Sequence, residues 1–518
     1  MENAQSPPEA RRELFPLLAS VFVVATCGLI YELVSGTLAS YLLGDSVFQF
    51  STVIGTYLFA MGVGSYLSRF VENDCARAFV RIELLVGAVG GFSSTLLFLL
   101  FDHVDSFPLV LYFLVFLIGA LVGMEIPLMM RILQGRLEFK DLVARIFAFD
   151  YVGALAASIL FPLIFAPKLG LMRTSILFGI LNVGVALWTL RVFEAEIARP
   201  WKLRWTGALL LLALVLGFAA SDRLVSFAEA AVYPHPILYT KSSPYQRIVV
   251  TRLHDEYRLY LNSHLQFSSR DEYRYHEALV HPGLSFLKDA RKVLVLGGGD
   301  GLAVREILKY PSVERVELVD LDPSVTELFE NWEPLRHLNG NAFASDRVEV
   351  IHQDAFQWLK RRKEVSDFDF VVVDFPDPTN FSIGKLYSTT FFKELRRTLR
   401  PDGVVVIQST SPLFARNSYW CIDATLKASG LETRPYHAYV PSFGEWGYTL
   451  AALPGTLPFR PLPRRSLPSG LKFLGDSATF SGLYEFPADM SPVPSEPNRL
   501  NNQILVGLYE REWSKVIQ

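Results

Sequence analysis

Long apolar runs dominate residues 15–221 of this 518-residue chain, whereas the remainder mixes apolar and charged positions as a globular domain does. A helix crosses the hydrocarbon core of a bilayer with about 20 apolar residues. Seven stretches approach or reach this length: 15–34, 50–69, 79–101, 107–130, 144–166, 171–191 and 205–221. Gly119 and Gly123 form a Gly-x-x-x-Gly pattern that favours close helix packing. We therefore predict an N-terminal segment over 1–14 and a transmembrane domain of about seven spans over 15–221.

Basic residues are distributed unevenly between the predicted loops. The loops after the second, fourth and sixth spans contain Arg69, Arg77, Arg81, Arg131, Arg136, Lys140, Arg145, Arg191, Arg199, Lys202 and Arg204, whereas the opposite loops contain Lys168 and Arg173. Because cytoplasmic loops are enriched in Lys and Arg, this distribution predicts a cytoplasmic N-terminus. Seven spans would then leave the rest of the chain on the opposite side of the membrane.

Charge and cysteine content argue against several classes of protein. The chain has 49 Lys and Arg against 52 Asp and Glu and no basic block, which argues against a nucleic-acid partner. Cys27, Cys75 and Cys421 are far apart and form no Cys-x-x-Cys pair. Neither a disulfide framework nor a metal site is therefore expected.

After Pro234 the pattern changes to that of a soluble α/β protein. Segments 246–253 and 257–262 predict a β-hairpin, in a small subdomain over 235–290 that ends with a helix at 271–288. The chain then alternates helices with predicted strands at 292–296, 315–321, 347–351, 369–373 and 403–408. This alternation predicts a doubly wound, Rossmann-like domain of the methyltransferase type over 291–452. The proline-rich remainder, 453–518, predicts irregular chain that ends in a helix near 499–515.

The first strand of this domain ends in a glycine-rich turn that contains an acid, Gly297-Gly298-Gly299-Asp300-Gly301. Glycines at such a turn let the backbone approach a ligand, and Asp320, at the end of the next strand, could accept hydrogen bonds from ribose hydroxyls. Dehydrogenases and methyltransferases share the glycine pattern. Asp300 argues against a dinucleotide ligand, because its carboxylate would repel a pyrophosphate. It would suit a sulfonium nucleoside that carries an ammonium group.

Two further acidic turns follow predicted strands. Asp354-Ala355 follows the third strand, where an acid could accept from an adenine amino group, and Asp374 and Asp377 follow the fourth in the run Asp-Phe-Pro-Asp-Pro. Ligands of such folds bind beyond the carboxyl ends of the strands, so these acids are predicted to converge on one crevice. A solvated acidic turn is the alternative interpretation of the Asp374 and Asp377 pair.

In order along residues 240–450, these motifs resemble those of the aminopropyltransferases, the family of the spermidine synthases. The resemblance depends on the run Asp271-Glu272-Tyr273-Arg274-Tyr275-His276-Glu277, the turn at 297–301 and the pattern Asp374-x-x-Asp377-Pro378. The whole chain is similar to the membrane-fused bacterial members. The resemblance implies transfer of the aminopropyl group of decarboxylated S-adenosylmethionine to putrescine, which gives spermidine and 5'-methylthioadenosine.

The resemblance also implies a role for each matching residue. Asp374 would be the catalytic carboxylate. The nucleoside would be bound by Gln246, Asp300 (ammonium), Asp320 (ribose), Asp354 (adenine) and Ala355, and the polyamine by Tyr275, His276, Asp300, Asp377 and Trp446, with Gln266 in the pocket wall.

The implied reaction is an SN2 displacement beside a sulfonium, which needs no metal, no covalent intermediate and no cofactor besides the co-substrate. An alkylammonium has a pKa near ~10 by analogy with lysine, so the acceptor is mostly protonated at neutral pH. Asp374 could take its proton as a general base, while Asp377 or Glu272 holds the distal ammonium. The expected partners are the polyamine, the nucleoside and the lipid bilayer, and a second copy of the chain in a homodimer is a further candidate.

Some positions depart from the common pattern of the family. Asp320 stands where many members have glutamate, and Leu261-Asn262-Ser263 replaces a common Leu-Asp-Gly turn. The segment 440–446 is shorter than the usual spermidine-synthase loop, lacks its tyrosine and is closer to the loop of thermospermine synthases. The acceptor amine therefore stays open between putrescine, as first choice, and cadaverine, agmatine or spermidine.

Two other functions share parts of this pattern. A methyltransferase that uses S-adenosylmethionine would have the same fold, but it has no need for Asp374 and Asp377 together with Tyr275 and His276. A polyamine transporter or sensor would bind its ligand without turnover, and an intact Asp374 argues against it.

The membrane half adds two expectations. Substrate supply favours a catalytic domain on the cytoplasmic side of the inner membrane, which conflicts with seven spans that begin inside. The conflict disappears if the run 205–221 lies along or re-enters the membrane, or if substrate is delivered outside. Glu32, Glu125 and Asp150 are costly within spans. They either lie at the interface or pair with basic residues such as Arg131, or they line a path for a cationic polyamine.

Overall fold

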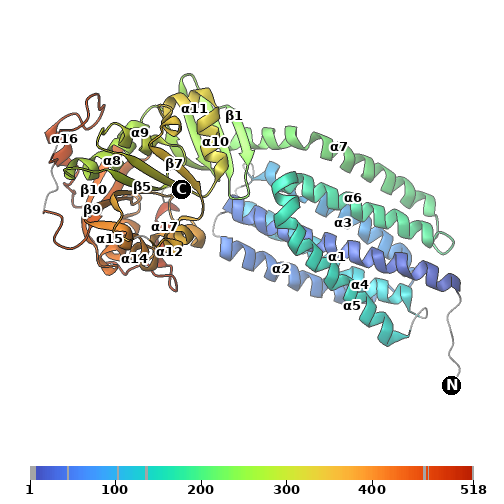
Figure 1. Cartoon of the computed structure of the whole chain (residues 1–518). Coiled ribbons are helices and arrows are strands. Elements are labelled where there is room, and N and C mark those ends of the chain that lie inside the picture. Colours follow the sequence, from blue (N-terminus) through green and yellow to red (C-terminus); the bar gives the residue numbers. More distant parts are fainter. Residues whose placement is uncertain are drawn as a thin grey trace. The chain divides into compact units, whose positions relative to one another are not determined.

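The structure is a computed structural model that describes residues 8–43, 46–101, 104, 106–134, 138–363, 365–458, 463–464 and 466–515. Its contacts divide the chain into two compact units, Met1–His235 and Pro236–Gln518. The predicted fold class is confirmed, because long apolar helices are followed by a small antiparallel sheet and a Rossmann-like domain (Figure 1).

The described part of the first unit contains seven α-helices and two short segments of other helical types. They are α1 (Pro8–Leu43), α2 (Ser46–Leu67), the 3₁₀ turn η1 (Ser68–Phe70), α3 (Cys75–Leu100), α4 (Phe107–Leu133), α5 (Phe139–Leu160), the π-helical η2 (Phe161–Leu169), α6 (Gly170–Val192) and α7 (Pro200–Val232). Close packing at the predicted glycines is confirmed. A Cβ on Gly123 of α4 would lie 2.2 Å from the Met61 carbonyl oxygen of α2, and one on Gly119 would lie 2.8 Å from that of Tyr57.

Six helical segments in the described part of the chain are long and apolar enough to cross a membrane. They are Leu17–Ser40, Val47–Phe70, Cys75–Leu100, Phe107–Leu133, Phe139–Val192 and Pro200–Ser221. The fifth combines two of the predicted spans, because α5 and α6 follow each other through η2 and meet at Gly170, where a φ of 76° changes the direction of the chain (Figure 1). The weakest predicted run, 205–221, lies in a segment of 22 residues. At 1.5 Å per residue this segment spans about 33 Å.

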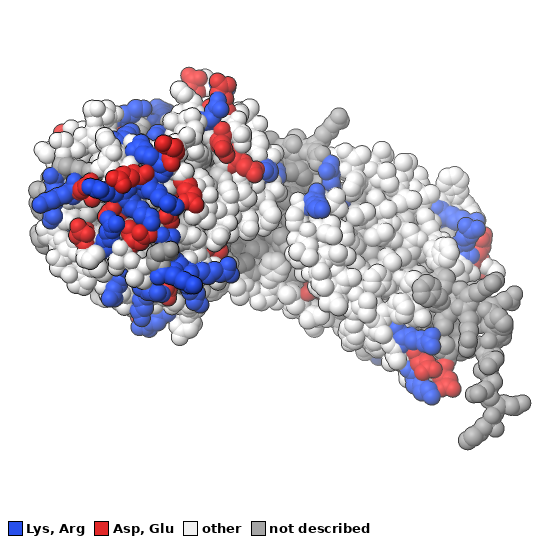
Figure 2. Space-filling view, in the orientation of Figure 1, with Lys and Arg blue, Asp and Glu red and all other residues white. Residues whose placement is uncertain are grey.

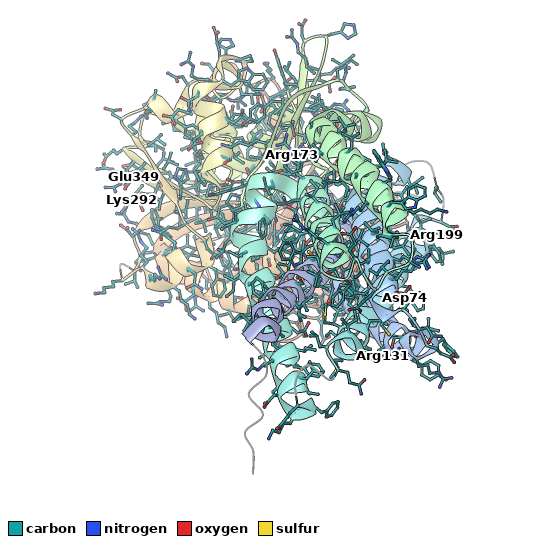
Figure 3. The ribbon with its side chains drawn as sticks, turned by 90° about the vertical axis from the view of Figure 1, so that its right-hand side faces the viewer. Asp74, Arg131, Arg173, Arg199, Lys292 and Glu349 are labelled. Carbon is teal, nitrogen blue, oxygen red and sulfur yellow. The ribbon has the colours of Figure 1, made fainter. Side chains whose placement is uncertain are left out.

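The charged side chains that are visible on the first unit gather in small groups, and the surface between the groups is largely apolar (Figure 2). Ion pairs between the loops after α2, α4 and α6 and the helices that follow join Asp74 with Arg77, Glu138 with Lys140 and Glu194 with Arg204. Figure 3 labels Asp74, Arg131 and Arg199 among the side chains of these polar segments. Arg131 donates to the carbonyl oxygens of Ser68, at 3.0 Å, and Val71.

The second unit begins with an antiparallel sheet of four strands in sequence order. They are β1 (Ile237–Ser242), β2 (Arg247–Leu253), β3 (Glu256–Leu261) and β4 (His264–Ser268). The predicted hairpin forms the two central strands. Asn262 and Ser263, with φ of 49° and 67°, make the tight turn between β3 and β4. The departure at Leu261-Asn262-Ser263 is therefore a two-residue hairpin turn.

A larger sheet has the strand order β10-β11-β9-β8-β5-β6-β7. Its strands are β5 (Lys292–Gly297), β6 (Arg315–Asp320), β7 (Val348–His352), β8 (Phe368–Asp374), β9 (Leu399–Gln408), β10 (Glu432–Val440) and β11 (Gly444–Ala452). Strands β5 to β9 pair in parallel, and β11 is antiparallel to both of its neighbours. The sequence pattern predicts neither β10 nor β11. Pro435 interrupts the apolar alternation of β10, which is tolerated because β10 is an edge strand.

Helices cover both faces of this sheet, as a doubly wound fold requires. They are α8 (Glu272–Phe286), α9 (Leu302–Leu308), α12 (Ala355–Arg361), α13 (Phe381–Gly384), α14 (Thr389–Thr398), α15 (Arg416–Ala428), α16 (Ser477–Gly482) and α17 (Ile504–Trp513). The helices α10 (Pro323–Asn331) and α11 (Glu333–Leu338) pack against the small antiparallel sheet. Val293 and Val295 of β5 enter one hydrophobic core, and Leu294 and Leu296 enter the other. The strand order reverses between β5 and β8, which is where such folds bind ligands.

The proline-rich segment after β11 is tied to α8 by a buried acid. Glu277 is 1% exposed and accepts hydrogen bonds from the backbone N–H groups of Lys472, Phe473 and Leu474 at 2.8, 2.9 and 2.9 Å. Three charge-assisted hydrogen bonds satisfy the buried carboxylate. This part of the chain is therefore fixed on the domain although it contains little regular structure.

Candidate active site

The glycine-rich turn after β5 is held against the carboxyl end of the neighbouring strand β8. Parallel pairing places Gly297 of β5 opposite Asp374 of β8, and the Gly298 N–H donates to the Asp374 carbonyl oxygen at 3.1 Å. Gly297 has a φ of 80°, and a Cβ there would lie 2.3 Å from the same oxygen. Glycine is therefore needed for this approach. As a result, the turn that contains Asp300 lies beside the Asp374 carboxylate.

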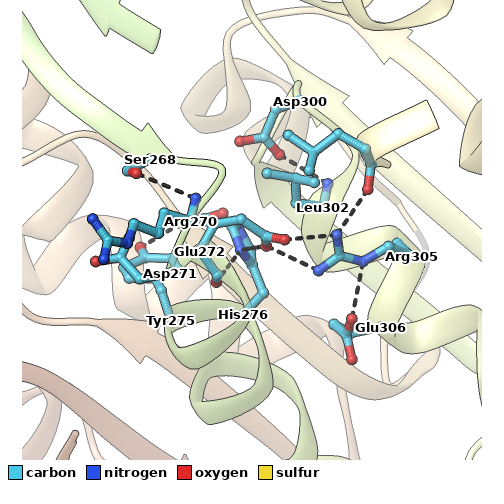
Figure 4. A network of polar contacts seen from close by, with 12 residues as sticks. Ser268, Arg270, Asp271, Glu272, Tyr275, His276, Asp300, Leu302, Arg305 and Glu306 are labelled. Carbon is cyan, nitrogen blue, oxygen red and sulfur yellow. Dashed lines mark hydrogen bonds and ion pairs between the residues drawn. The ribbon is translucent and has the colours of Figure 1, made fainter. Parts of the chain in front are cut away.

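Helix α8 adds Tyr275 and His276 to this edge of the sheet. The Tyr275 hydroxyl donates to Asp374 Oδ1 at 2.7 Å. His276 Nδ1 lies 2.9 Å from Glu272 Oε2, and Arg305 donates to both Glu272 carboxylate oxygens at 2.9 Å (Figure 4). The charge of Glu272 is therefore balanced within the protein. Glu272 orients His276 instead of offering a free carboxylate to a distal ammonium.

Asp300, Asp374 and His276 influence one another's ionisation. Burial raises the pKa of Asp300 to about 6; the Asp374 charge adds to the rise and the His276 charge opposes it. Burial also raises the pKa of Asp374, against the effects of His276 and of the Tyr275 hydrogen bond. Burial lowers the pKa of His276, but Glu272 and the two aspartates outweigh it and raise that pKa above its ordinary value. A cationic ligand would stabilise the charged form of both aspartates.

Asp320, at the end of β6, is oriented by backbone groups. It accepts from the Gly299 N–H at 3.1 Å and from the Asp322 N–H at 2.9 Å, and burial raises its pKa to about 6. Gln246 is joined to this region through Asp322, because its side-chain amide donates to Asp322 Oδ2 at 3.0 Å. Ser243 donates to the same oxygen at 2.6 Å. Asp322 thus links the turn after β1 to the turn after β6.

Sequence reasoning misses Asp322, which is 1% exposed. Its side chain caps α10 by accepting from the Ser324 N–H at 3.0 Å, and Pro323 follows it directly. An Asp-Pro step before a helix is a recognisable N-cap signal. That signal predicts the start of a helix, but it does not reveal the partners Gln246 and Ser243.

Asp354 is engaged by groups of the protein itself. It caps α12 by accepting from the Gln357 N–H at 2.9 Å, and Lys385 Nζ lies 2.8 Å from its other carboxylate oxygen. Burial opposes the charged form, but Lys385 and the backbone hydrogen bonds prevail and lower the pKa of Asp354. Ala355 begins the capped helix and is buried. The predicted contact of Asp354 with adenine stays a prediction.

Asp377 is surrounded by uncharged donors. The Gln408 side-chain amide donates to Oδ1 at 3.1 Å, and the hydroxyls of Tyr509 and Thr410 lie 2.9 and 3.5 Å from Oδ2. Burial raises the pKa of Asp377 to about 6, and these hydrogen bonds moderate the rise. Tyr509 belongs to α17 near the end of the chain, a segment in which the sequence shows no chemical motif. Tyr509, near the end of the chain, therefore forms a hydrogen bond with the acid that is predicted to bind the amine.

Trp446 lies on β11 in an aromatic cluster beside the same helix. Its ring centroid is 5.0 Å from that of Phe443 and 6.4 Å from that of Trp513 on α17, which is 5.8 Å from that of Tyr509. Within the described residues, the indole N–H groups of Trp446 and Trp513 are buried and have no acceptor. Gln266 lies on β4, where its amide donates to the His264 carbonyl oxygen at 3.1 Å.

Five of the predicted site residues therefore meet at the carboxyl edge of the large sheet. Tyr275 binds Asp374 directly, His276, Asp300 and Asp374 influence one another's charge, and Asp320 contacts the same glycine-rich turn. Among the residues that the structure describes, no group of three or more His, Cys, Asp and Glu is arranged to hold a metal ion. The arrangement favours binding of a cation and removal of a proton by a buried carboxylate.

The chain matches known proteins over both units. Residues 272–456 match the family called "Spermine/spermidine synthase domain". "Polyamine aminopropyltransferase 1" of Ralstonia nicotianae is 56% identical over 520 residues, which cover 99% of this chain and 98% of that protein. "Polyamine aminopropyltransferase" of Leptospira interrogans is 53% identical over 502 residues, which cover 97% and 99%. The fold is of the Rossmann-like class, and the similarity to these relatives identifies a transferase. The chain belongs to the polyamine aminopropyltransferase family.

A solved structure of similar fold is described as spermidine synthase from Thermotoga maritima. It is 24% identical in sequence, with a TM-score of 0.44, and the match covers 52% of this chain and 88% of that one.

Tyr509 is expected to position Asp377 for the amine substrate. Tyr509→Phe removes one hydrogen bond to a carboxylate, an interaction worth about 1.5 kcal/mol or roughly tenfold in affinity. We therefore expect the KM of the polyamine substrate to rise about tenfold, with a much smaller change in kcat. Tyr484→Phe is the matched control, because the buried Tyr484 hydroxyl has no partner within the described residues. Equal KM values for the two variants would contradict this role.

Proposed function

We propose that this protein transfers the aminopropyl group of decarboxylated S-adenosylmethionine to putrescine, giving spermidine and 5'-methylthioadenosine. The observation that carries the proposal is the pairing of Asp374 with the Tyr275 hydroxyl, directly beside Asp300 and the glycine-rich turn. Membership of the polyamine aminopropyltransferase family supports the same reaction class.

The reaction forms a bond between the acceptor nitrogen and the methylene carbon next to the sulfonium. The carbon–sulfur bond breaks, and its electron pair neutralises the sulfur of the leaving methylthioadenosine. The acceptor amine must first lose a proton, because an alkylammonium with a pKa near ~10 has no free electron pair. Asp374 is the proposed acceptor of that proton, and the Tyr275 hydroxyl at 2.7 Å orients its carboxylate.

The other acids are proposed to hold the two substrates in line. Asp300 binds the ammonium of the donor, and Asp320 accepts from the ribose hydroxyls. Asp377 binds the distal ammonium of the acceptor, while Gln246, His276 and Trp446 border the two substrates. Such positioning supplies a large part of the rate enhancement in a two-substrate reaction. A diamine would offer one nitrogen to Asp374 and one to Asp377, and putrescine is the diamine that the resemblance to spermidine synthases favours.

Replacement of Asp374 tests the proposed general base. Asp374→Asn keeps the size of the side chain and removes its proton affinity, so turnover should fall by about 10²–10⁴-fold. Binding of the nucleoside should change little, since Asp300 and Asp320 remain. Methylthioadenosine release would be followed with putrescine, cadaverine, agmatine and spermidine as acceptors. Near-normal turnover of Asp374→Asn would refute the role of Asp374, and methyl transfer from S-adenosylmethionine would refute the reaction class.

The pH dependence follows from the pKa values of about 6 for Asp300 and Asp377. A carboxyl group is charged above its pKa, and the ammonium groups of the substrates bind the charged form. We therefore expect kcat/KM to rise between about pH 5 and 7, since this parameter reports ionisation of the free enzyme. Asp300→Asn should remove part of this rise when the donor concentration is varied. A profile that is flat over this interval in the unchanged enzyme would contradict the assignment.

The helical unit is proposed to span the inner membrane, with the catalytic unit on the cytoplasmic side. The six apolar segments support insertion by their length, and the supply of nucleoside supports the orientation. The basic loops favour the opposite orientation if all seven helices cross. The cytoplasmic orientation therefore requires either that one helix does not cross or that the basic loops lie outside.

Reporter fusions after Gln518 distinguish these orientations. A fused green fluorescent protein should fluoresce, because it matures in the cytoplasm, and a fused alkaline phosphatase should be inactive. The reverse pair of results would place the catalytic unit outside and would contradict the proposed orientation.

A further inference from the structure

Four helices of the first unit each contain a carboxylic acid well inside an apolar segment. The acids are Glu32 on α1, Glu83 on α3, Glu125 on α4 and Asp150 on α5. Glu83 is 0% and Glu125 is 3% exposed. Within the described residues, none of the four forms an ion pair with a basic side chain. The predicted pairing with Arg131 is wrong, because Arg131 donates to carbonyl oxygens in the turn after α2.

Three of these acids line one cavity between α1, α2, α3, α4 and α5. Glu32, Glu125 and Asp150 contribute the charged groups of a cavity of about 200 Å³. Its remaining wall is mainly apolar and includes Val21, Leu29, Leu58, Met61, Ile126 and Met129. A water molecule occupies about 30 Å³ in the liquid. The cavity is therefore large enough for a small organic molecule.

Glu125 lines this cavity without a basic partner. Its Oε1 is buried, and the side-chain partner of its carboxyl group among the described residues is the carboxyl group of Glu83. The hydroxyl of Tyr57, which also lines the cavity, does not donate to Glu125, because that hydroxyl donates to the Gly28 carbonyl oxygen at 2.8 Å. Behind the wall, Asn182 donates to Glu83 Oε2 at 3.0 Å, and the Glu83 carboxyl group also forms a hydrogen bond with that of Glu125. A hydrogen bond between two acids supplies no positive charge, and a buried charge is costly without a counter-charge, so this arrangement points to a cationic ligand.

We propose that this cavity binds an aliphatic amine cation that carries more than one ammonium group. Ammonium groups provide both positive charge and N–H donors, which the carboxylates of Glu32, Glu125 and Asp150 lack. The apolar wall fits the methylene chain between them. A metal ion fits poorly, because within the described residues no group of three or more acids and histidines is arranged to hold one. This site is separate from the catalytic unit and does not depend on the proposed reaction.

Equilibrium binding of radiolabelled putrescine and spermidine to the full chain in lipid nanodiscs tests the proposal. The nucleoside co-substrate is left out, and every sample carries Asp377→Asn to weaken amine binding in the catalytic unit. We expect saturable binding of one amine per chain. Glu125→Gln should raise the Kd at least tenfold, because it removes the charge that faces the cavity.

Two further variants separate the site from general effects on the helices. Ala154 lines the cavity, so Ala154→Leu should fill it and raise the Kd by a similar factor without any change of charge. Glu138 is exposed and pairs with Lys140, so Glu138→Gln should leave the Kd unchanged. In chains that retain Asp377, aminopropyl transfer by Glu125→Gln should equal that of the unchanged protein, which shows that the variant is folded.

Several outcomes would overturn the proposal. One is an unchanged Kd in both Glu125→Gln and Ala154→Leu, and another is equal competition by 1,4-butanediol, the uncharged analogue of putrescine. Displacement of the amine by sodium or potassium at equal concentration would assign the site to an inorganic cation. If Glu125→Gln does not fold, the amine Kd values of Ala154→Leu and Asp150→Asn test the proposal instead, and unchanged values in both would overturn it. Amine binding without any aminopropyl transfer would refute the proposed reaction and leave this site standing.

Discussion

The parallel pairing of β5 with β8 is the constraint on which the catalytic unit depends. It sets Gly297 opposite Asp374, and the hydrogen bond from the Gly298 N–H to the Asp374 carbonyl oxygen closes the two strand ends on each other. This approach requires glycine at position 297, because a Cβ on Gly297 would overlap the Asp374 carbonyl oxygen. Two acidic turns that are far apart in the sequence thereby become neighbours. The remaining contacts of the site are arranged around this pair.

Near Gly297 and Asp374, some buried acids have a basic partner and others have none within the described residues. Arg305 binds both oxygens of Glu272, and Glu272 in turn orients His276, so this network balances its own charge. Asp374 and Asp377 instead receive hydrogen bonds from the neutral hydroxyls of Tyr275 and Tyr509. A hydroxyl orients a carboxylate without cancelling its charge. The difference separates the acids that maintain the structure from those that can accept a cation.

The helical unit shows the same physical contrast in a more apolar setting. Acids near the ends of its helices form ion pairs with basic residues, whereas the buried Glu83 and Glu125 have each other as carboxyl partners and no basic residue in the described part of the chain. Such groups lower the stability of an apolar bundle unless a ligand compensates them. Glu125 lines a cavity together with Glu32 and Asp150, and this position supports the inferred binding site.

The sequence by itself determined the apolar helices, the alternation of strands and helices, and the edge at which the acids of the glycine-rich turn and of β8 meet. These follow from short-range rules, because apolar periodicity defines each element and parallel strands end at a common edge. The tertiary structure alone decided the strands β10 and β11, the link from Gln246 to Asp322 and the approach of Tyr509 to Asp377. Each of these joins residues distant along the chain. Local patterns contain no information about such partners, since packing of the whole domain selects them.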